Sequence, residues 1–491
     1  MRISSDWNFA GRLVARLGKS SDLIDAATGE SFPAKDVPGL IVGIAAKFLS
    51  LGLKPGDRVL ISCDVSPASS LAYLGAVYAG CVPVLLDERT LGASGELAFT
   101  KAQAKAAWTG RRVCWDWARK NGLPHIEGIF EPLPVHSLRP SPCEENDLAA
   151  LMPTSGSSGI PRLVMVSHGN LIANTEAIIR SQHLGTDEKA MLIMPVSYCF
   201  GASIMHTHLY QGGGVVFDSR FMFPDKVLQA INQYGCTTFA GVPTVYNILL
   251  RRSHVSSITM PGLRRLLQAG GPLAPESIQE LRSILTTADF FVMYGQTEAT
   301  SRVSCLPPDR LGEKLGSAGI PLDNLTVRIM DDEGEELPNG QTGEIQVRGP
   351  SVCSGYLDDP EATQQKFDHG WLNTGDLGSR DEEGYLRISG RASEFVKIRG
   401  VRVSFAEVEA KMAAIPGVYE CAAAGVQHPE AGEALALFVV GENGADALVE
   451  TVRRALPPQW TCNSVKVVTE LPRTANGKIA RSQLHSMAVE T

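Results

Sequence analysis

The feature that most constrains the fold is a regular alternation of amphipathic helices and short apolar strands near the start of the chain. Apolar residues recur at helical spacing over Leu40–Leu49, and a Lys-Pro-Gly-Asp turn then leads into an apolar strand at Arg58–Cys63. A second helix is predicted over Ser66–Tyr78 and a second strand over Val82–Leu86. Strands that are connected through helices pair in parallel and are covered by those helices. The first part of the chain is therefore predicted to be α/β, with a parallel sheet.

The same alternation returns between residues 164 and 295. Short apolar runs are separated there by stretches with helical periodicity. The runs are Met191–Met194, Gly214–Phe217, Thr238–Ala240 and Phe290–Met293. A second parallel sheet covered by helices is therefore expected.

The residue pattern changes after about residue 315. Asp331-Asp332-Glu333-Gly334 and Pro338-Asn339-Gly340 have the composition of tight turns between short β segments. This pattern predicts a small β-rich subdomain that follows the two parallel sheets.

Gly390-Arg391 opens a last segment of about 100 residues. A helix is predicted at Glu407–Ala414 and a strand at Ala434–Val440. We expect a large N-terminal domain over residues 1–391 and a smaller α+β domain over residues 392–491.

Length and charge limit the classes of function. The 491 residues, 44% of them hydrophobic, are enough for more than one buried core. A net charge of −8, from 45 basic and 53 acidic residues, argues against a nucleic-acid surface or a polybasic membrane anchor. The ten cysteines lack metal-ligand spacing and are expected to be reduced thiols. No apolar stretch has the length of a signal peptide or a membrane span, so a soluble cytoplasmic protein with small substrates is expected.

The strongest local motif is a loop of glycines and hydroxyl residues between two apolar runs. It consists of Thr154, Ser155, Gly156, Ser157, Ser158, Gly159, Ile160, Pro161 and Arg162. Glycines let the backbone approach phosphate closely, while amide and hydroxyl groups donate hydrogen bonds to its oxygens. The alternative interpretation is a flexible Ser/Gly linker. The spacing is not that of a Walker A loop.

Further motifs follow in a fixed order and resemble those of the adenylate-forming superfamily, which includes acyl-CoA synthetases, luciferases and peptide-synthetase adenylation domains. The loop resembles the phosphate-binding signature of that superfamily. The other matching segments are Gln268-Ala269-Gly270-Gly271-Pro272, Tyr294-Gly295-Gln296-Thr297-Glu298, Thr374-Gly375-Asp376, Gly390-Arg391 through Gly400 and Arg402, and Pro472 through Lys478. The resemblance extends from about residue 37 to 483.

The resemblance implies an ATP-dependent acid–thiol ligase, with ATP, Mg²⁺ and CoA or a phosphopantetheine thiol as cofactors. A carboxylate attacking the α-phosphate of ATP meets a repelling anion, so cations and oriented donors are needed there. By resemblance, Lys478, Thr154 and Glu298 are the catalytic residues, and Glu298 is the magnesium ligand because hard cations prefer carboxylate oxygen. Taken alone, Lys478 and Glu298 would be interpreted as solvated surface charges.

Nucleotide binding is assigned by the same resemblance. Asp376 would accept hydrogen bonds from both ribose hydroxyls, although a turn-forming Asp after Gly375 is the ordinary alternative. The remaining residues expected to contact ATP or AMP are Thr154, Ser155, Gly156, Ser157, Ser158, Gly159, Arg162, Gly270, Gly271, Pro272, Tyr294, Gly295, Gln296, Thr297 and Arg391.

A mobile C-terminal domain is also implied. It would present Lys478 for adenylation and then rotate about Ser393, so that Lys397, Gly400 and Arg402 frame a tunnel for the thiol arm. Gly400 would let the backbone pass close to that arm.

The acid pocket implied by the resemblance is mostly apolar or small, which favours an acid with an apolar body. Its residues would be Tyr198, Phe200, Gly201, Met205, Gly241, Val242, Tyr246, Gln268, Ala269 and Gly270. Several of them, Met205 above all, are equally interpreted as core residues of the second sheet. Cys199 is expected to be a buried thiol.

Three positions depart from the usual pattern. Arg162 replaces a lysine, which keeps the charge but changes its geometry. Ser393 replaces the Asp or Lys of the hinge. Gly201 stands where adenylation domains for amino acids carry an aspartate, so an α-amino acid substrate is not expected.

The acceptor and the activity itself have alternatives. The motifs suit an acyl-CoA synthetase and also a stand-alone ligase that loads an acyl carrier protein. A non-enzymatic nucleotide-binding relative is a third interpretation, which the presence of Lys478, Glu298 and Asp376 argues against.

Overall fold

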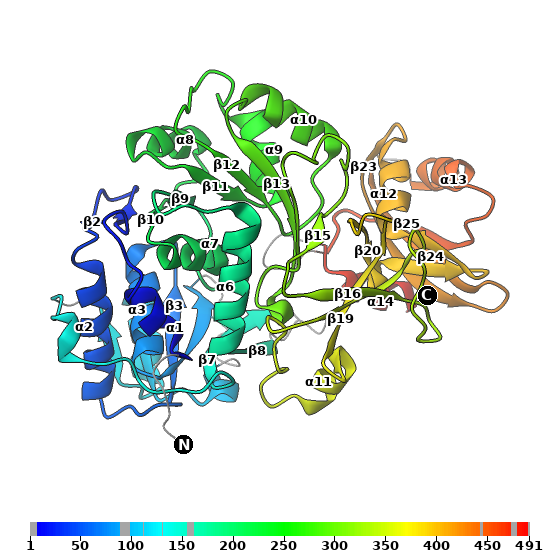
Figure 1. Cartoon of the computed structure of the whole chain (residues 1–491). Helices are drawn as coiled ribbons and strands as arrows, with labels where there is room; N and C mark the ends of the chain where they lie inside the picture. The colour runs from blue at the N-terminus through cyan, green and yellow to red at the C-terminus, as the bar shows by residue number, and fades with distance from the viewer. Residues whose placement is uncertain are drawn as a thin grey trace. The chain divides into compact units, whose positions relative to one another are not determined.

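A computed structural model describes residues 7–88, 99–110, 112–129, 131–154, 162–441, 445–472 and 479–489 (Figure 1). The chain divides into two compact units. The first contains residues 1–341, 345–374 and 379–387, and the second contains residues 342–344, 375–378 and 388–491. Each unit has hydrophobic cores of its own. The domain limits expected from the sequence, 1–391 and 392–491, stay a prediction.

The first sheet of the larger unit has six strands, and the predicted βαβ rhythm produces its parallel part. Its order is β6-β5-β3-β4-β7-β8, and only β7 and β8 pair antiparallel. The strands are β3 (Arg58–Cys63), β4 (Val82–Asp87), β5 (Ala106–Thr109), β6 (His125–Glu127), β7 (Leu148–Thr154) and β8 (Arg162–Ser167). The predicted parallel sheet is confirmed.

The second sheet of this unit has nine strands in the order β15-β14-β13-β12-β11-β9-β10-β1-β2. Its six central strands run parallel, and the edge strands pair antiparallel. The strands are β1 (Leu23–Asp25), β2 (Ser31–Phe32), β9 (Lys189–Leu192), β10 (Gly214–Phe217), β11 (Thr238–Gly241), β12 (Arg265–Gln268), β13 (Asp289–Tyr294), β14 (Ser304–Leu306) and β15 (Ile320–Pro321). The four apolar runs singled out in the sequence lie in or beside β9, β10, β11 and β13.

Helices lie between the two sheets and on the outer side of each (Figure 1). Between the sheets, α6 packs on β7 and β8, α7 packs on β9 and β10, and the two helices contact each other. The helices of this unit are α1 (Phe9–Val14), α2 (Val37–Ser50), α3 (Pro67–Tyr78), α5 (Arg112–Lys120), α6 (His168–Gln182), α7 (Cys199–Tyr210), α8 (Pro224–Gln233), α9 (Pro243–Arg252), α10 (Pro275–Ile284) and α11 (Pro360–Lys366), with short 3₁₀ turns η3 (Val135–Ser137) and η4 (Thr297–Ala299).

Capping residues determine where two of these helices begin. Ser66 caps α3 by accepting a hydrogen bond from the Ser69 amide, and Pro67 occupies the first helical position. Ser167 and Asn170 form a reciprocal capping box at the start of α6. The predicted start of a helix at Ser66 is therefore confirmed.

The β-rich segment expected after residue 315 forms a small five-stranded sheet. Its strands are β16 (Thr326–Met330), β17 (Gly343–Arg348), β18 (Phe367–Asp368), β19 (Trp371–Arg380) and β20 (Leu386–Arg391). The order is β16-β17-β19-β18, and β20 also pairs with β19.

The smaller unit is α+β and contains a sheet with the order β22-β21-β24-β23, with β25 paired to β24. Along β24, Leu435, Leu437 and Val439 pack into one core, while Ala434, Ala436 and Phe438 pack into another. This period of two shows that both faces of the sheet are covered. The elements are η5 (Ala392–Glu394), β21 (Phe395–Ile398), β22 (Val401–Ser404), α12 (Phe405–Ala413), β23 (Val418–His428), β24 (Gly432–Gly441), α13 (Ala445–Ala455), β25 (Cys462–Val467) and α14 (Arg481–Val489).

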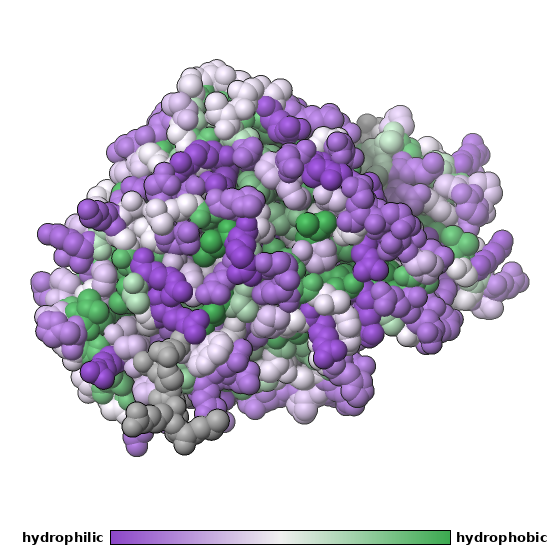
Figure 2. All heavy atoms as spheres, in the orientation of Figure 1, coloured by the Kyte–Doolittle hydropathy of each residue, from purple (hydrophilic) through white to green (hydrophobic). Residues whose placement is uncertain are grey.

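The surface is mixed in polarity. Figure 2 shows hydrophobic residues in small separate patches among hydrophilic ones on the face that it draws. Within the described part of the chain, no helix combines the length and the hydropathy needed to cross a bilayer.

The packing of β24 generates a stability prediction. Phe438 has no exposed surface, so Phe438→Ala should leave a cavity and lower the free energy of unfolding of the smaller unit by about 3–5 kcal/mol. Hydrogen exchange of peptides from β23 and β24 measures this local opening. Tyr419→Ala is the matched control, because Tyr419 lies in the same sheet with 65% of its surface exposed. Equal exchange in the two variants would contradict the assignment of Phe438 to the core.

Candidate active site

The motif residues of the larger unit gather at one edge of its second sheet. Strands β9, β11, β12 and β13 run parallel, and the chain leaves each of them toward Tyr198, Val242, Gly270 and Glu298 respectively. The crevice beyond the carboxyl ends of parallel strands is the usual ligand site of open α/β sheets.

Three loops that are far apart in the sequence meet at Gly270. Its φ of +86° is a left-handed conformation that favours glycine. A Cβ atom at this position would lie 2.7 Å from the Tyr198 hydroxyl oxygen and 3.1 Å from Cγ1 of Val242. The structure therefore places these three predicted pocket residues together.

Other predicted pocket residues lie deeper. Met205 and Tyr246 have no exposed surface and pack in two different hydrophobic cores of the unit. The Tyr246 hydroxyl donates a hydrogen bond to the Leu267 carbonyl oxygen at 3.0 Å. Nε2 of Gln268 donates to the Gly271 carbonyl oxygen at 2.7 Å, which closes the turn after β12. Gly241 and Ala269, at the ends of β11 and β12, are also buried.

Glu298 is held by a tyrosine that the sequence motifs did not include. Its carboxylate is buried with 8% exposure, and the Tyr356 hydroxyl donates to its Oε1 at 2.7 Å. Burial, followed by the charge of Glu298, raises the pKa of Tyr356, which therefore stays a hydrogen-bond donor. The Arg162 guanidinium lies 5.4 Å from the centre of the Tyr356 ring, and its Nε lies 3.4 Å from Oδ2 of Asp359. Tyr356 thus connects Glu298 to the strand that follows the phosphate loop.

The segment around Thr297 links further motifs. The Thr297 hydroxyl donates to Sγ of Cys199 at 3.4 Å, and Nε2 of Gln296 donates to the Thr374 carbonyl oxygen at 3.4 Å. Cys199 is the buried thiol expected from the sequence, and burial raises its pKa, which makes the thiol unreactive. The Tyr-Gly-Gln-Thr-Glu motif therefore contacts both the start of α7 and the Thr-Gly-Asp motif.

The phosphate loop begins and ends on a β hairpin. Thr154 closes β7, Arg162 opens β8, and these two residues are paired across the strands. The loop residues Ser155–Gly159 and the predicted catalytic Lys478 lie outside the described residues. Their roles stay predictions.

Asp376 and Arg391 form an ion pair in the smaller unit. Nε of Arg391 lies 2.9 Å from Oδ1 of Asp376, whose side chain is almost fully buried. The predicted ribose ligand is thus held in place by a residue that was also expected to bind the nucleotide.

The predicted thiol-tunnel segment is a β hairpin in the smaller unit. Lys397 of β21 and Arg402 of β22 are paired across it. Its turn contains Arg399 and Gly400, whose φ angles are +50° and +82°. Two consecutive positive φ angles are typical of a tight hairpin turn, so Gly400 is required by its backbone conformation. Ser393 lies in η5, one turn before this hairpin.

Gly201 has no room for a side chain. A Cβ atom there would lie 2.5 Å from the Pro195 carbonyl oxygen and 3.0 Å from that of Met194. An aspartate at this position would therefore require a shift of the backbone before α7.

The sequence motifs missed Tyr356, Asp359, Asn174 and Arg302. Tyr356 and Asp359 lie about 60 residues after Glu298 in a segment without a motif. Arg302 lies just beyond the Tyr294–Glu298 motif, and its backbone is held by Asn174, whose Nδ2 donates to the Arg302 carbonyl oxygen at 2.9 Å. The sequence did contain a signal for Arg302, because it is the single charged residue among the small and apolar residues 299–306.

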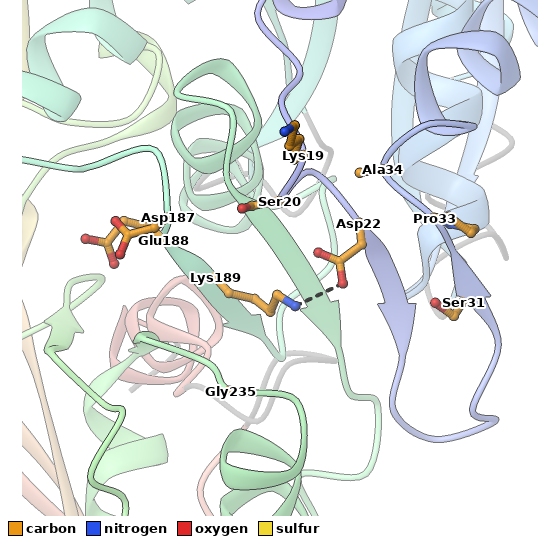
Figure 3. Close-up of a pocket in the computed structure, with 10 residues that line it drawn as sticks. All are labelled: Lys19, Ser20, Asp22, Ser31, Pro33, Ala34, Asp187, Glu188, Lys189 and Gly235. Carbon is orange, nitrogen blue, oxygen red and sulfur yellow. Dashed lines mark hydrogen bonds and ion pairs between the residues drawn. The ribbon is translucent and has the colours of Figure 1, made fainter.

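A depression on the larger unit lies at the opposite edge of the second sheet (Figure 3). Lys189 opens β9 there, and its Nζ lies 2.9 Å from Oδ2 of Asp22. Figure 3 shows the side chains of Asp187 and Glu188 pointing away from this ion pair. The depression is thus at the amino ends of the parallel strands and is separate from the motif residues.

Comparisons with known proteins cover both parts of the chain. Residues 39–357 match the profile of the AMP-binding enzyme family, and residues 407–478 match that of the AMP-binding enzyme C-terminal domain. The sequence is 34% identical over 458 residues to a feruloyl-CoA synthase from Amycolatopsis sp, with 90% of this chain and 91% of that protein covered.

Two further similarities agree with this result. The sequence is 33% identical over 368 residues to a sulfoacetate–CoA ligase from Cupriavidus necator, with 74% of this chain and 70% of that protein covered. The crystal structure of ATP-bound MatB from Rhodopseudomonas palustris is similar with a TM-score of 0.82 and 27% identity, and the alignment covers 98% of both chains.

Gly295 generates a prediction about the site. A Cβ atom there would lie 2.9 Å from Cα of Arg302 and would overlap the Ser301 carbonyl oxygen. Gly295→Ala should force this loop apart and lower the free energy of unfolding by about 1–3 kcal/mol. Scanning calorimetry measures the change. Gly312→Ala is the control, since nothing lies within 4 Å of its Cβ position. A wild-type melting temperature for Gly295→Ala would contradict the close contact.

Proposed function

Because the chain belongs to the AMP-binding enzyme family, we propose that it is an AMP-forming acid–thiol ligase. ATP and a carboxylic acid give an acyl-AMP and pyrophosphate, and the thiol of CoA then displaces AMP to give an acyl-CoA. The observation that carries this proposal is the meeting of the motif loops at the carboxyl ends of β9, β11, β12 and β13.

The first half-reaction needs the acid carboxylate to approach the α-phosphate. The Tyr198 hydroxyl and the Val242 side chain lie so close to Gly270 that a side chain there would clash with them, and the acid is assigned to the surface that these three residues form. Thr154 and Arg162 sit at the two ends of the loop that would donate to the phosphates. Lys478 would stabilise the charge that develops between carboxylate and phosphate.

Glu298 fits a magnesium site. Tyr356 orients its buried carboxylate, and the described residues contain no cluster of three or more acidic, histidine or cysteine ligands. Mg²⁺ often takes only one or two protein carboxylates, with phosphates and water as its other ligands. When bound, the ion would neutralise charge on the phosphates.

The second half-reaction is assigned to the hairpin that contains Lys397, Gly400 and Arg402. CoA is the proposed acceptor because the two relatives described above are named as CoA-dependent enzymes. The phosphopantetheine of an acyl carrier protein is the alternative acceptor, since it offers the same thiol.

A hydroxylamine-trapping screen over aliphatic, aromatic and amino acids tests the function. The wild-type chain should form a hydroxamate from at least one acid with ATP, and that acid should then give a thioester with CoA. Lys478→Ala should abolish acyl-AMP formation and keep much of the thioester formation from supplied acyl-AMP, because the lysine acts only in adenylation.

Lys411→Ala is the control for this substitution, because Lys411 is an exposed residue of α12. Equal loss of both half-reactions in Lys478→Ala would contradict the role of the lysine. The absence of any hydroxamate across the panel, with dicarboxylic acids among the aliphatic and aromatic members, would overturn the proposed ligase.

Gly270 generates a prediction for the acid pocket. Gly270→Val would push against Tyr198 and Val242 and should exclude bulky acids, with a loss of about tenfold or more in kcat/KM relative to acetate or another small acid. The readout is the kcat/KM for the bulky acid divided by the kcat/KM for the small acid, because a general loss of stability lowers both values equally. Gly340→Val is the control, because Gly340 also has a positive φ but no atom lies within 4 Å of its Cβ position. An unchanged ratio would place the pocket elsewhere.

A further inference from the structure

Arg302 is a buried cation beside the proposed acid pocket. It lies between η4 and β14, and only 1% of its surface is exposed. Asn174 fixes its backbone from both sides: the Asn174 amide donates to the Arg302 carbonyl at 2.9 Å, and the Arg302 amide donates to Asn174 Oδ1 at 3.3 Å. The position of the Arg302 backbone is therefore determined by its contacts with α6.

One edge of the Arg302 guanidinium has no partner. Its Nε and Nη2 are buried and make no hydrogen bond to any described residue. Buried donors are almost always satisfied in folded proteins, and an unpaired buried charge is strongly unfavourable. These two N–H groups therefore point to a ligand that supplies acceptors.

The same edge binds carboxylates at two other arginines of this chain. Nε and Nη2 of Arg180 lie 2.6 and 2.8 Å from the two carboxylate oxygens of Asp323. Nε and Nη2 of Arg220 lie 2.9 and 2.7 Å from those of Asp218. This pair of donors matches the geometry of a carboxylate. The unpaired edge of Arg302 offers the same two donors as these carboxylate-binding arginines.

No described group neutralises this charge. Burial lowers the pKa of Arg302 to about 10, so the guanidinium stays charged at neutral pH. The titratable groups that influence it are Cys305, Cys199 and Tyr198, and burial raises the pKa of each of them, so they are neutral. The guanidinium therefore has no ionised counter-group among the described residues.

The position of Arg302 connects it to the acid pocket. Its guanidinium lies over the Phe200 ring at 5.0 Å, and the Phe200 ring packs edge-on against Tyr198 at 6.4 Å. Tyr198 is the residue whose hydroxyl adjoins Gly270. Tyr198 is also the N-cap residue of the twelve-residue helix α7, and its side chain accepts no hydrogen bond from the first backbone amides of the helix. The partial positive charge of this helix end is a second feature that favours an anion.

We propose that Arg302 binds a second anionic group at the far end of the acid, so that the substrates of this protein are dicarboxylic acids. The inference rests on the proposed function, because it concerns the acid that is adenylated. One carboxylate reacts with ATP, and the other is held by Nε and Nη2 of Arg302. Arg302 acts in binding and specificity, and it takes no part in bond making or breaking. A sulfonate is the other oxyanion that fits the same fork, and one similar enzyme is named for sulfoacetate.

Matched acids test this proposal. Pyrophosphate release is measured with the full chain for straight-chain dicarboxylic acids of three to eight carbons, for monocarboxylic acids of equal length, and for the monomethyl esters of the diacids. The best diacid should exceed both of its matched compounds in kcat/KM by about tenfold or more, the factor that a charge-assisted bidentate hydrogen bond supplies.

Two variants separate recognition from a structural role. In Arg302→Met, the kcat/KM for the diacid divided by the kcat/KM for its monomethyl ester should fall to about one or below. Arg180→Met is the control, because Arg180 is already paired with Asp323, and it should keep the wild-type value of this quotient. Thermal denaturation provides a second readout, since removing an unpaired buried charge should not lower the melting temperature.

The outcomes are distinct. A wild-type chain that uses monocarboxylic acids or the monomethyl esters as well as the diacids would overturn the assignment of Arg302 and leave the ligase intact. Equal loss of activity with all acids in Arg302→Met, together with a lower melting temperature, would make Arg302 a structural residue and also overturn it. Absence of pyrophosphate release with every acid would overturn the proposed function itself.

Discussion

The site depends on the close approach of the chain to itself at Gly295. After β13 ends, the chain passes through Glu298 and returns so that the Val303 amide donates to the Tyr294 carbonyl oxygen at 2.9 Å. Space for this return exists only because residue 295 lacks a Cβ atom. Thr300, with a φ of +67°, lies at the sharpest part of the loop and is held by the Ser351 carbonyl oxygen at 2.7 Å. One tight loop thus orients Glu298 on one side and Arg302 on the other.

Much of the framework could be predicted from the sequence, because periodicity and capping are local. The strands at Arg58–Cys63 and Gly214–Phe217 and the helix beginning after Ser66 are where the pattern placed them. The ordered motifs also identified the loops that meet at Gly270 and Glu298. Contacts between these loops were not predictable, because they join residues that are dozens of positions apart and depend on strand order. The bond from Tyr356 to Glu298 is an example.

The structure adds physical reasons for several residues whose predicted roles stay predictions. Gly400 was expected to make room for a thiol arm, and that role stays a prediction; its φ of +82° adds that a tight turn favours glycine there. Met205 and Tyr246 were expected to line the acid pocket, with a core position as the equal alternative for Met205, and the structure packs both in hydrophobic cores. In each case the backbone conformation or the local packing gives a physical reason for the residue.

Arg302 shows what a sequence motif omits. Its backbone is fixed by Asn174, a residue of α6 that lies 128 positions earlier, so its burial depends on the packing of α6 between the two sheets. An unpaired buried guanidinium costs several kcal/mol, which a fold tolerates only where another group completes it. Glu298 and Arg302 lie four positions apart on one rigid loop. In the proposed function, this loop therefore fixes the distance between the nucleotide end of the site and the site for the second anion, and it selects acids by length and by charge together.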